Sequence, residues 1–156
     1  MPNIELDAFD RKILRVVQRD GKISMQELAE AAGLSTSPCW RRVRRLEQAG
    51  VIHKYAAMLD ARALGLQAMA YVQVSLLEHS EATIAKFDSF VQREDNIVEC
   101  SSITGANDYL LKVVALDPED LESFLMKRLL GLGIVRSSTT NFVLRQKKYS
   151  TALPVD

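Results

Sequence analysis

Hydrophobic residues recur with a helical period along three stretches of the first fifty residues. Residues 7–19 predict a first helix that begins at the N-cap Asp7. Residues 24–32 predict a second helix, because Ser24 and Glu27 have the spacing of a capping box and Gly33 follows as a C-terminal glycine. The residues expected to face inward on the second helix are Leu28, Ala31 and Ala32.

The stretch SPCWRRVRRLEQAG, residues 37–50, predicts a third helix with two chemically different faces. Ser37 is expected to cap this helix, and Pro38 suits its first position because proline has no amide hydrogen to satisfy. The residues expected to face inward are Cys39, Val43 and Leu46. On the other side helix phase places Arg41, Arg44 and Arg45, with Trp40 and Arg42 on the flanks.

After Gly50 the pattern changes to alternating apolar and polar residues, which predicts β-strands. Strands are expected at residues 51–55, 68–76, 97–104, 109–115 and 135–147, with helices starting at Ser80 and at Asp117-Pro118. From residue 68 onward the order is β-α-β-β-α-β, which is that of a ferredoxin-like domain. A sheet with helices on one face only often pairs with a second copy, so we expect a dimer. The predicted fold class is α+β.

The chain of 156 residues has 20 basic and 20 acidic side chains, and this neutral total argues mildly against a nucleic-acid binder. The local clustering of charge argues in favour of such a binder, since four arginines fall within residues 41–45. A short helix, a glycine turn and a second helix rich in hydrogen-bond donors is the plan of a helix-turn-helix. Arginine donates in pairs to guanine edges and to phosphate oxygens. The sequence therefore predicts a helix-turn-helix that binds double-stranded DNA.

Two roles are expected within this helix-turn-helix. Arg41 and Arg44 are the candidates for base edges, and Ser37, Arg42 and Arg45 are the candidates for phosphates. The full candidate set is Ser35, Thr36, Ser37, Trp40, Arg41, Arg42, Arg44 and Arg45. The alternative is a basic helix face that is merely solvated, with Trp40 packed in a core or an interface.

The sequence offers little for other chemistry. We expect no metal site and no cofactor, because the two cysteines and two histidines have no metal-ligand spacing and no phosphate loop or nucleophile elbow occurs. Cys39 and Cys100 are interpreted as reduced, mostly buried thiols. No apolar run approaches the about 18 residues of a membrane span, and the first residues lack the features of a signal peptide. We therefore expect a cytoplasmic protein with no membrane partner.

Four motifs together resemble the Lrp/AsnC (leucine-responsive/asparagine, feast/famine) family of bacterial transcriptional regulators. They are LDAFDRKIL at 6–14, GLSTSPCWRRVRRLEQAGVI at 33–52, TGANDYLLKV at 104–113 and STTNFVLRQKKYSTALP at 138–154. The resemblance implies a winged-helix-like DNA-binding domain at 1–52, a linker at 53–66 and a ferredoxin-like effector and oligomerisation domain at 67–156. It also implies a homo-oligomer, a dimer that assembles further to an octamer as a tetramer of dimers.

The family resemblance further implies a regulator of amino-acid metabolism whose small effector, an amino acid, binds in clefts between dimers. The expected effector-binding residues are Thr104, Gly105, Asp108, Thr139, Thr140 and Phe142. Relatives often carry an acidic residue directly after the glycine, where this chain has Ala106. Without the resemblance, the preferred interpretation of Asn107 and Asp108 is the chemistry of a plain β-hairpin turn, because such turns are common.

Two other functions are compatible with the same architecture. Some relatives of this architecture are tetrapyrrole decarboxylases, which need cationic or histidine groups in the cleft, and this chain offers only His53 and His79. The other alternative is a metabolite-binding oligomer without DNA binding, distinguished by the absence of salt-dependent binding to DNA. We expect a regulator and not an enzyme.

Overall fold

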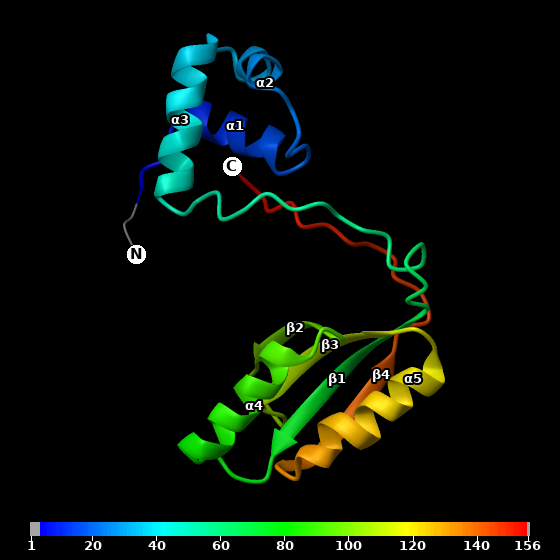
Figure 1. The fold of residues 1–156 in the computed structure, drawn as a ribbon. Coiled ribbons are helices and arrows are strands. Elements are labelled where there is room, and N and C mark those ends of the chain that lie inside the picture. Colours follow the sequence, from blue (N-terminus) through cyan, green and yellow to red (C-terminus); the bar gives the residue numbers. More distant parts are fainter. Residues whose placement is uncertain (1–3, 156) are drawn as a thin grey trace. The chain divides into compact units, whose positions relative to one another are not determined.

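The computed structural model describes residues 4–155 as two compact units (Figure 1). Residues 4–58 form a helical unit together with residues 148–155, and residues 59–147 form a sheet unit. The predicted division of the chain at residues 52 and 67 stays a prediction. In the part of the chain that the structure describes, no helix is long and apolar enough to cross a membrane.

The helical unit contains α1 (Ala8–Val17), α2 (Met25–Ala32) and α3 (Thr36–Gln48). Asp7 caps α1, and Ser24 and Glu27 form the predicted capping box of α2. Gly33 ends α2 in the left-handed conformation, with φ 73°, which a glycine adopts without strain. These predictions are confirmed, because each depends on side chains within three or four residues of the helix end.

The three helices enclose a small apolar core. Its fully or mostly buried members are Ile13, Leu14, Val17, Leu28, Ala29, Ala32, Cys39, Val43 and Leu46. The predicted inward face of α3 is confirmed. On α2 the prediction was wrong at Ala31, which is exposed, while Ala29 is buried in its place.

The start of α3 differs from the prediction. The N-cap is Ser35, whose carbonyl accepts the first helical hydrogen bond from the Cys39 amide at 3.2 Å, so the prediction of Ser37 as the cap was wrong. Pro38 is the third helical residue and not the first. A proline is tolerated there because the first four amides of a helix have no partner within the helix.

The predicted strand at residues 51–55 was also wrong. The chain leaves α3 after Gly50, which has φ 72°, and continues as a bend and an extended segment without strand pairing. A strand needs a hydrogen-bonded neighbour, and the alternation of side chains alone does not supply one.

The sheet unit has the predicted ferredoxin-like order. Its elements are β1 (Ala68–Leu76), α4 (Glu81–Arg93), β2 (Ile97–Ser102), β3 (Tyr109–Ala115), α5 (Pro118–Ser123) and β4 (Val135–Phe142). The strands form one antiparallel sheet in the order β2-β3-β1-β4 (Figure 1). The α+β fold class is confirmed, and so are the N-caps Ser80 and Asp117.

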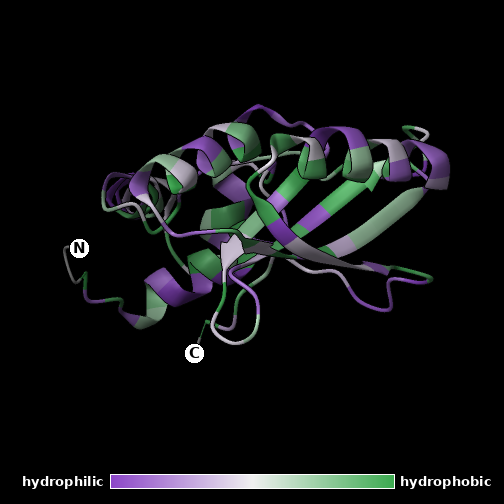
Figure 2. Ribbon diagram, turned by 90° about the horizontal axis from the view of Figure 1, so that it is seen from below, coloured by the Kyte–Doolittle hydropathy of each residue, from purple (hydrophilic) through white to green (hydrophobic). Residues whose placement is uncertain are grey.

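Alternation along β1 gives this sheet a buried face. Even-numbered residues of β1 from Ala68 to Leu76 are at most 1% exposed and pack with Phe87, Phe90 and Phe124 from the helices. Figure 2 shows the same alternation as hydrophobic and hydrophilic bands along the strands. The odd-numbered residues lie on the opposite face, where Tyr71 is exposed.

Three details of the sheet unit differ from the prediction. After α5 the chain continues as a π-helix (Phe124–Leu129) and a short 3-10 turn (Leu130–Leu132). β4 ends at Phe142 and not at residue 147, since Phe142 pairs with Ala70 near the start of β1 and little of that strand remains. Cys100 is exposed, so the prediction of a buried thiol holds for Cys39 only.

Candidate DNA interface and effector site

One face of α3 is free of core contacts. Its exposed residues are Ser37, Trp40, Arg41, Arg44 and Gln48, each three or four positions from another member of the set. We call this set the α3 stripe. The Arg44 guanidinium lies over the Trp40 ring, 5.6 Å from its centroid, and pairs with Glu47 at 3.6 Å. Trp40 is 49% exposed, so it is not a core residue of the described unit.

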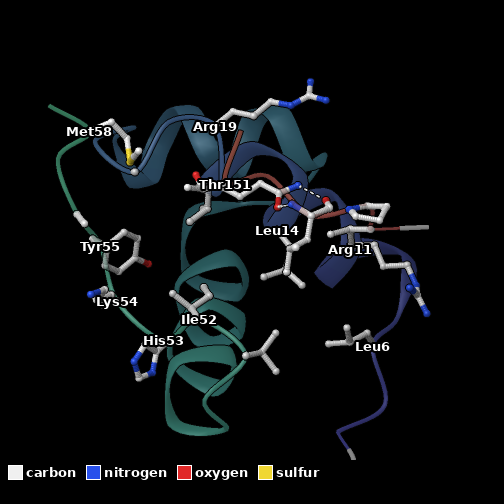
Figure 3. Close-up of a pocket in the computed structure, with 18 residues that line it drawn as sticks. Leu6, Arg11, Leu14, Arg19, Ile52, His53, Lys54, Tyr55, Met58 and Thr151 are labelled. Atoms are coloured by element: carbon white, nitrogen blue, oxygen red, sulfur yellow. Dashed lines mark hydrogen bonds between the residues drawn. The ribbon is translucent and has the colours of Figure 1, made fainter. Parts of the chain in front are cut away.

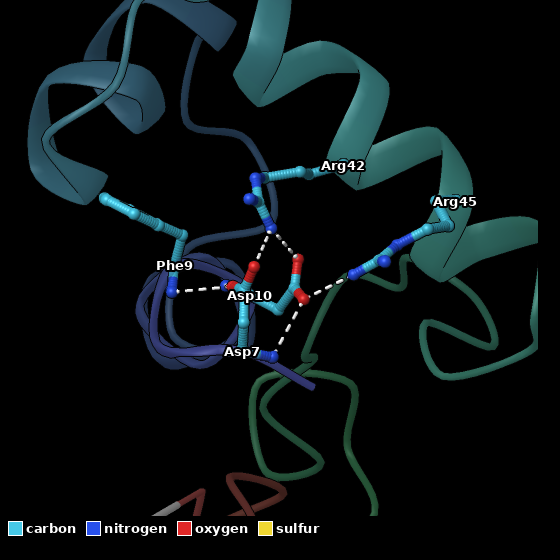
Figure 4. A network of polar contacts seen from close by, with 5 residues as sticks. All are labelled: Asp7, Phe9, Asp10, Arg42 and Arg45. Atoms are coloured by element: carbon cyan, nitrogen blue, oxygen red, sulfur yellow. Dashed lines mark hydrogen bonds and ion pairs between the residues drawn. The ribbon is translucent and has the colours of Figure 1, made fainter. Parts of the chain in front are cut away.

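The other two arginines of α3 face α1 instead (Figure 4). Arg42 Nη1 donates to Asp7 Oδ2 at 2.6 Å and to Asp10 Oδ1 at 2.9 Å, and Arg45 pairs with Asp10 Oδ2. Asp10 is fully buried and also accepts a hydrogen bond from the Asp7 amide at 3.1 Å. These contacts fix the orientation of α3 on α1, and they link residues 32 to 35 positions apart.

The ion pairs with Asp7 and Asp10 limit the donors that Arg42 and Arg45 can offer to DNA, and the predicted phosphate contacts of both arginines stay predictions. Arg42 uses one nitrogen for two carboxylates, and its side chain is 27% exposed. The Arg45 side chain is 48% exposed, and a guanidinium has five N–H donors. Arg45 therefore has donors left for a phosphate while it holds Asp10.

Ser35, Thr36 and Ser37 are exposed at the start of α3, where the helix presents unpaired amides. The Ser35 side chain makes no capping hydrogen bond. Hydroxyls and amides at the N-terminus of a helix suit a phosphate, because the helix dipole favours negative charge there.

Asp7 gives the helical unit an acid-sensitive contact. Its pKa is lowered to about 2 by the hydrogen bond from the Asp10 amide and by the Arg42 side chain. A carboxyl whose folded pKa is depressed stabilises the fold above its unfolded pKa, and this stabilisation is lost as the pH falls toward the folded value. We therefore expect the helical unit to lose stability between about pH 4 and pH 2, as followed by circular dichroism in urea. In Asp7→Asn this part of the acid response should be smaller. An identical pH profile in the variant would contradict this account of Asp7.

The loop at residues 103–108, which carries the predicted effector residues Thr104, Gly105 and Asp108, lies at the end of β1. The Leu76 amide donates to Asp108 Oδ2 at 2.8 Å, and His79 Nε2 lies 2.9 Å from Asp108 Oδ1. The hydrogen bond from Leu76, followed by that from His79, lowers the pKa of Asp108. Asp108 therefore holds the loop against β1 as an ionised carboxylate.

Other contacts complete this loop. The side-chain nitrogen Nδ2 of Asn107 donates to Gln73 Oε1 at 2.9 Å, and the Ser75 hydroxyl donates to Asn107 Oδ1 at 3.2 Å. Gly105 has φ 122°, a conformation that side chains other than glycine rarely adopt. Thr104 and Gly105 are exposed, so the turn presents its backbone to solvent.

The predicted residues of the last strand lie on β4, on the far side of β1 from the loop. Thr139 pairs with Gln73, which places Thr139 on the open face of the sheet near the contact with Asn107. Thr140 and Phe142 pair with Val72 and Ala70, so they belong to the helix-covered face. The structure thus brings Thr139 toward the loop, but it places Phe142 near the other end of β1.

Sequence reasoning missed four polar residues around the loop, which are Gln73, Ser75, His79 and Arg136. Arg136 donates to the Leu77 carbonyl at 2.7 Å and lowers the pKa of Asp108 through its charge. The alternation of β1 could have pointed to Gln73 and Ser75, as polar residues on a strand with an apolar opposite face. Nothing in the sequence signals that His79 and Asp108 meet.

Among the described residues no group of three or more histidines, cysteines, aspartates and glutamates could hold a metal ion.

Comparison with known proteins assigns both halves of the chain. Residues 6–53 match the winged helix-turn-helix DNA-binding family, and residues 69–153 match the Lrp/AsnC ligand binding domain. The chain is 40% identical over 145 residues to the leucine-responsive regulatory protein of Rhizobium meliloti, covering 93% of each chain. It is 37% identical over 154 residues to the transcriptional regulatory protein DoeX of Halomonas elongata, covering 98% of each.

Solved structures agree with this assignment. A transcriptional regulator of Neisseria meningitidis, in complex with L-Met, superposes with a TM-score of 0.94 at 34% sequence identity. The match covers 97% of this chain and 98% of that one. The resemblance predicted from four sequence motifs is confirmed, and the chain belongs to the Lrp/AsnC family of transcriptional regulators.

Proposed function

We propose that this regulator reads specific DNA sequences in the cytoplasm through α3, and that an amino acid bound to the sheet unit modulates its DNA binding. The observation that carries the DNA part is the α3 stripe. It presents Arg41 and Arg44 on the face opposite Cys39, Val43 and Leu46, which are buried. A helix held by its apolar side can enter the major groove with its other side.

Within this proposal Arg41 and Arg44 contact base edges, and Trp40 supports Arg44 through its ring. Ser35, Thr36 and Ser37 contact phosphates together with Arg45, which has donors to spare. Arg42 holds both Asp7 and Asp10 and is less exposed than Arg45, so we assign it mainly to the orientation of α3.

The DNA part is tested by fluorescence anisotropy with DNA from upstream of the chain's own gene and with a scrambled sequence, over a salt series. Specific binding predicts tighter binding to the native DNA and a steep fall of affinity with salt, because phosphate contacts release counterions. No binding to either DNA at any salt concentration would contradict the proposal.

We further propose that the chain acts as a homo-oligomer, with dimers that associate further to a tetramer of dimers. The support is the open face of the sheet, which no helix of the sheet unit covers and which carries Tyr71 and Leu110. Two copies of the helical unit would then read half-sites about 34–36 Å apart, one turn of DNA. Light scattering of the purified protein measures the mass, and a monomer at micromolar concentration would contradict this part.

The effector proposal is supported by the loop at residues 103–108 and by the Neisseria relative, whose structure holds L-Met. Exposed backbone amides of the Thr104–Gly105 turn suit a carboxylate. The Asp108 carboxylate favours a nearby ammonium, and Thr139 adds a hydroxyl on the same face. Thr140 and Phe142 lie on the other face of the sheet. They would join this site through a second subunit that completes it at the sheet edge.

Removing the Asp108 carboxylate should abolish the influence of the effector on DNA binding. In Asp108→Ala the Leu76 amide and His79 lose their acceptor, so two of the contacts that hold the loop on β1 are lost together with the negative charge. We expect the change in DNA affinity caused by the effector to disappear, while dimerisation and basal DNA binding remain. Anisotropy with and without the amino acid measures this change, with Asp95→Ala as a control for an exposed carboxylate of the same unit. An unchanged effector response in Asp108→Ala would refute the assignment.

A further inference from the structure

A pocket of about 570 Å³ lies in the helical unit (Figure 3). None of the eighteen residues that line it belongs to α3 or to the sheet unit. The lining comes from α1 with its flanking turns, from residues 51–58 and from residues 151–155. Sites for small molecules typically measure about 300–1,000 Å³ and are mostly apolar with a few polar groups. The volume of this pocket falls within that range.

Packing holds two sides of the pocket in place. Leu14 and Val17 of α1 contribute apolar surface from the edge of the core. Across from them, the Tyr55 hydroxyl donates to Glu47 Oε1 at 3.1 Å, and its ring lies against Gly21. A Cβ at Gly21 would stand only 3.3 Å from the ring, so the glycine allows this close approach.

The C-terminal segment forms a third side. The Gln18 amide group donates to the Leu153 carbonyl and accepts from the Leu153 amide, both at 2.9 Å. Arg15 Nε donates to the Val155 carbonyl at 2.7 Å, and the Val155 side chain packs against the helical core. Three hydrogen bonds and one apolar contact therefore fix this segment on α1.

The charge of the lining is one-sided. It contains Arg11, Arg19 and Lys54, and none of the eighteen lining residues is an aspartate or glutamate. Apolar side chains such as Leu14, Ile52, Met58 and Leu153 supply the remaining surface. A site lined by apolar side chains and by cations, with no carboxylate in its lining, favours a ligand with an apolar body and a negative head.

We propose that this pocket binds an apolar monocarboxylate, at a site separate from the amino-acid site of the sheet unit. The cations of its lining would repel the ammonium group of an amino acid, which distinguishes the two ligand classes. Residues 51–58 and 151–155 are the segments through which the chain enters and leaves the sheet unit. A bound carboxylate would therefore contact both connecting segments together with α1.

Isothermal titration calorimetry of the full chain tests this proposal with sodium octanoate as the probe. Octylammonium has the same chain with the opposite charge and serves as the ligand control. We expect one octanoate site per chain and at least tenfold weaker binding of octylammonium. In the double variant Arg19→Gln, Lys54→Gln the octanoate affinity should fall about tenfold or more, because charge-assisted contacts are lost. Lys127→Gln, on the sheet unit, should leave it unchanged.

A second variant tests the place of binding. Ala56→Trp inserts a large side chain from the lining and should abolish octanoate binding, whereas Ala63→Trp, at an exposed position outside the lining, should not. Thermal unfolding followed by circular dichroism shows that the variants remain folded. Absence of octanoate binding, equal binding of octylammonium, or full binding by folded Ala56→Trp would each overturn the proposal.

Discussion

Replacing both Arg41 and Arg44 by alanine should weaken binding to a cognate DNA site by a factor on the order of 10² to 10⁴, because a good bidentate base contact is worth about 1–3 kcal/mol. Both side chains are exposed on the α3 stripe, and neither supports the core of the helical unit. The folded state should therefore be retained. Fluorescence anisotropy with native and scrambled DNA measures the loss.

The control removes the same charge elsewhere. Arg62→Ala with Lys127→Ala takes two exposed cations from the sheet unit and should change DNA affinity little. Arg41→Lys separates charge from geometry, since lysine cannot donate in the paired fashion of a guanidinium. If the double alanine variant binds native DNA as tightly as the control variant, α3 does not read the site through these arginines.

Asp10→Ala should destabilise the helical unit by about 2–3 kcal/mol. Breaking a buried ion pair usually costs about 3–5 kcal/mol. We expect a smaller cost here, because Arg42 and Arg45 are partly exposed and water can solvate them once Asp10 is removed. The Asp7 amide also loses an acceptor. Urea unfolding followed by circular dichroism measures this free energy of unfolding.

Asp20→Ala serves as the matched control, because Asp20 is an exposed carboxylate that accepts a local hydrogen bond from the Lys22 amide. Its free energy of unfolding should change by less than about 1 kcal/mol. Asp10→Ala should also weaken specific DNA binding in the folded fraction, since α3 loses its fixed orientation on α1. An Asp10→Ala protein as stable as Asp20→Ala would show that the ion network contributes nothing to the fold.

Short-range chemistry explains which parts of this fold could be predicted from the sequence. The N-caps Asp7, Ser24, Ser80 and Asp117 were predicted because a cap and its helix are neighbours in the chain. The bounds of β1 followed from alternation between a buried and an open face, and β3 was also predicted with its observed bounds. Helix phase predicted Arg41 and Arg44 on the face opposite the core, but it placed Arg45 there too, and Arg45 pairs with Asp10 of α1.

Contacts between distant residues explain the differences. Arg42 and Arg45 were predicted to contact phosphates, and helix phase gives no indication that Asp7 and Asp10, more than thirty positions earlier, pair with them. Residues 51–55 have the alternation of a strand but no strand pairs with them. The place of the C-terminal residues on α1 likewise depends on Gln18, 135 positions before Leu153.

The effector site was predicted least completely, for the same reason. Family resemblance pointed to Thr104, Gly105 and Asp108, but the side chains that hold the loop come from β1 and from the turn after it. Their positions depend on the register of the sheet. Register is set by the pairing of β1 with β3 and β4, and a single sequence contains no direct record of it.

The central claim is that one chain couples DNA reading to amino-acid binding, and linkage tests it most directly. Anisotropy first measures the affinity for native DNA with and without each amino acid, beginning with L-methionine. Calorimetry then measures the affinity of the active amino acid for the free protein and for the DNA-bound protein. Thermodynamic coupling requires both affinities to change by the same factor, typically about 5- to 150-fold. We predict equal factors for the natural chain and a factor of one for Asp108→Ala. An amino acid that binds the protein without any change of DNA affinity, or no binding of any amino acid, would contradict the claim.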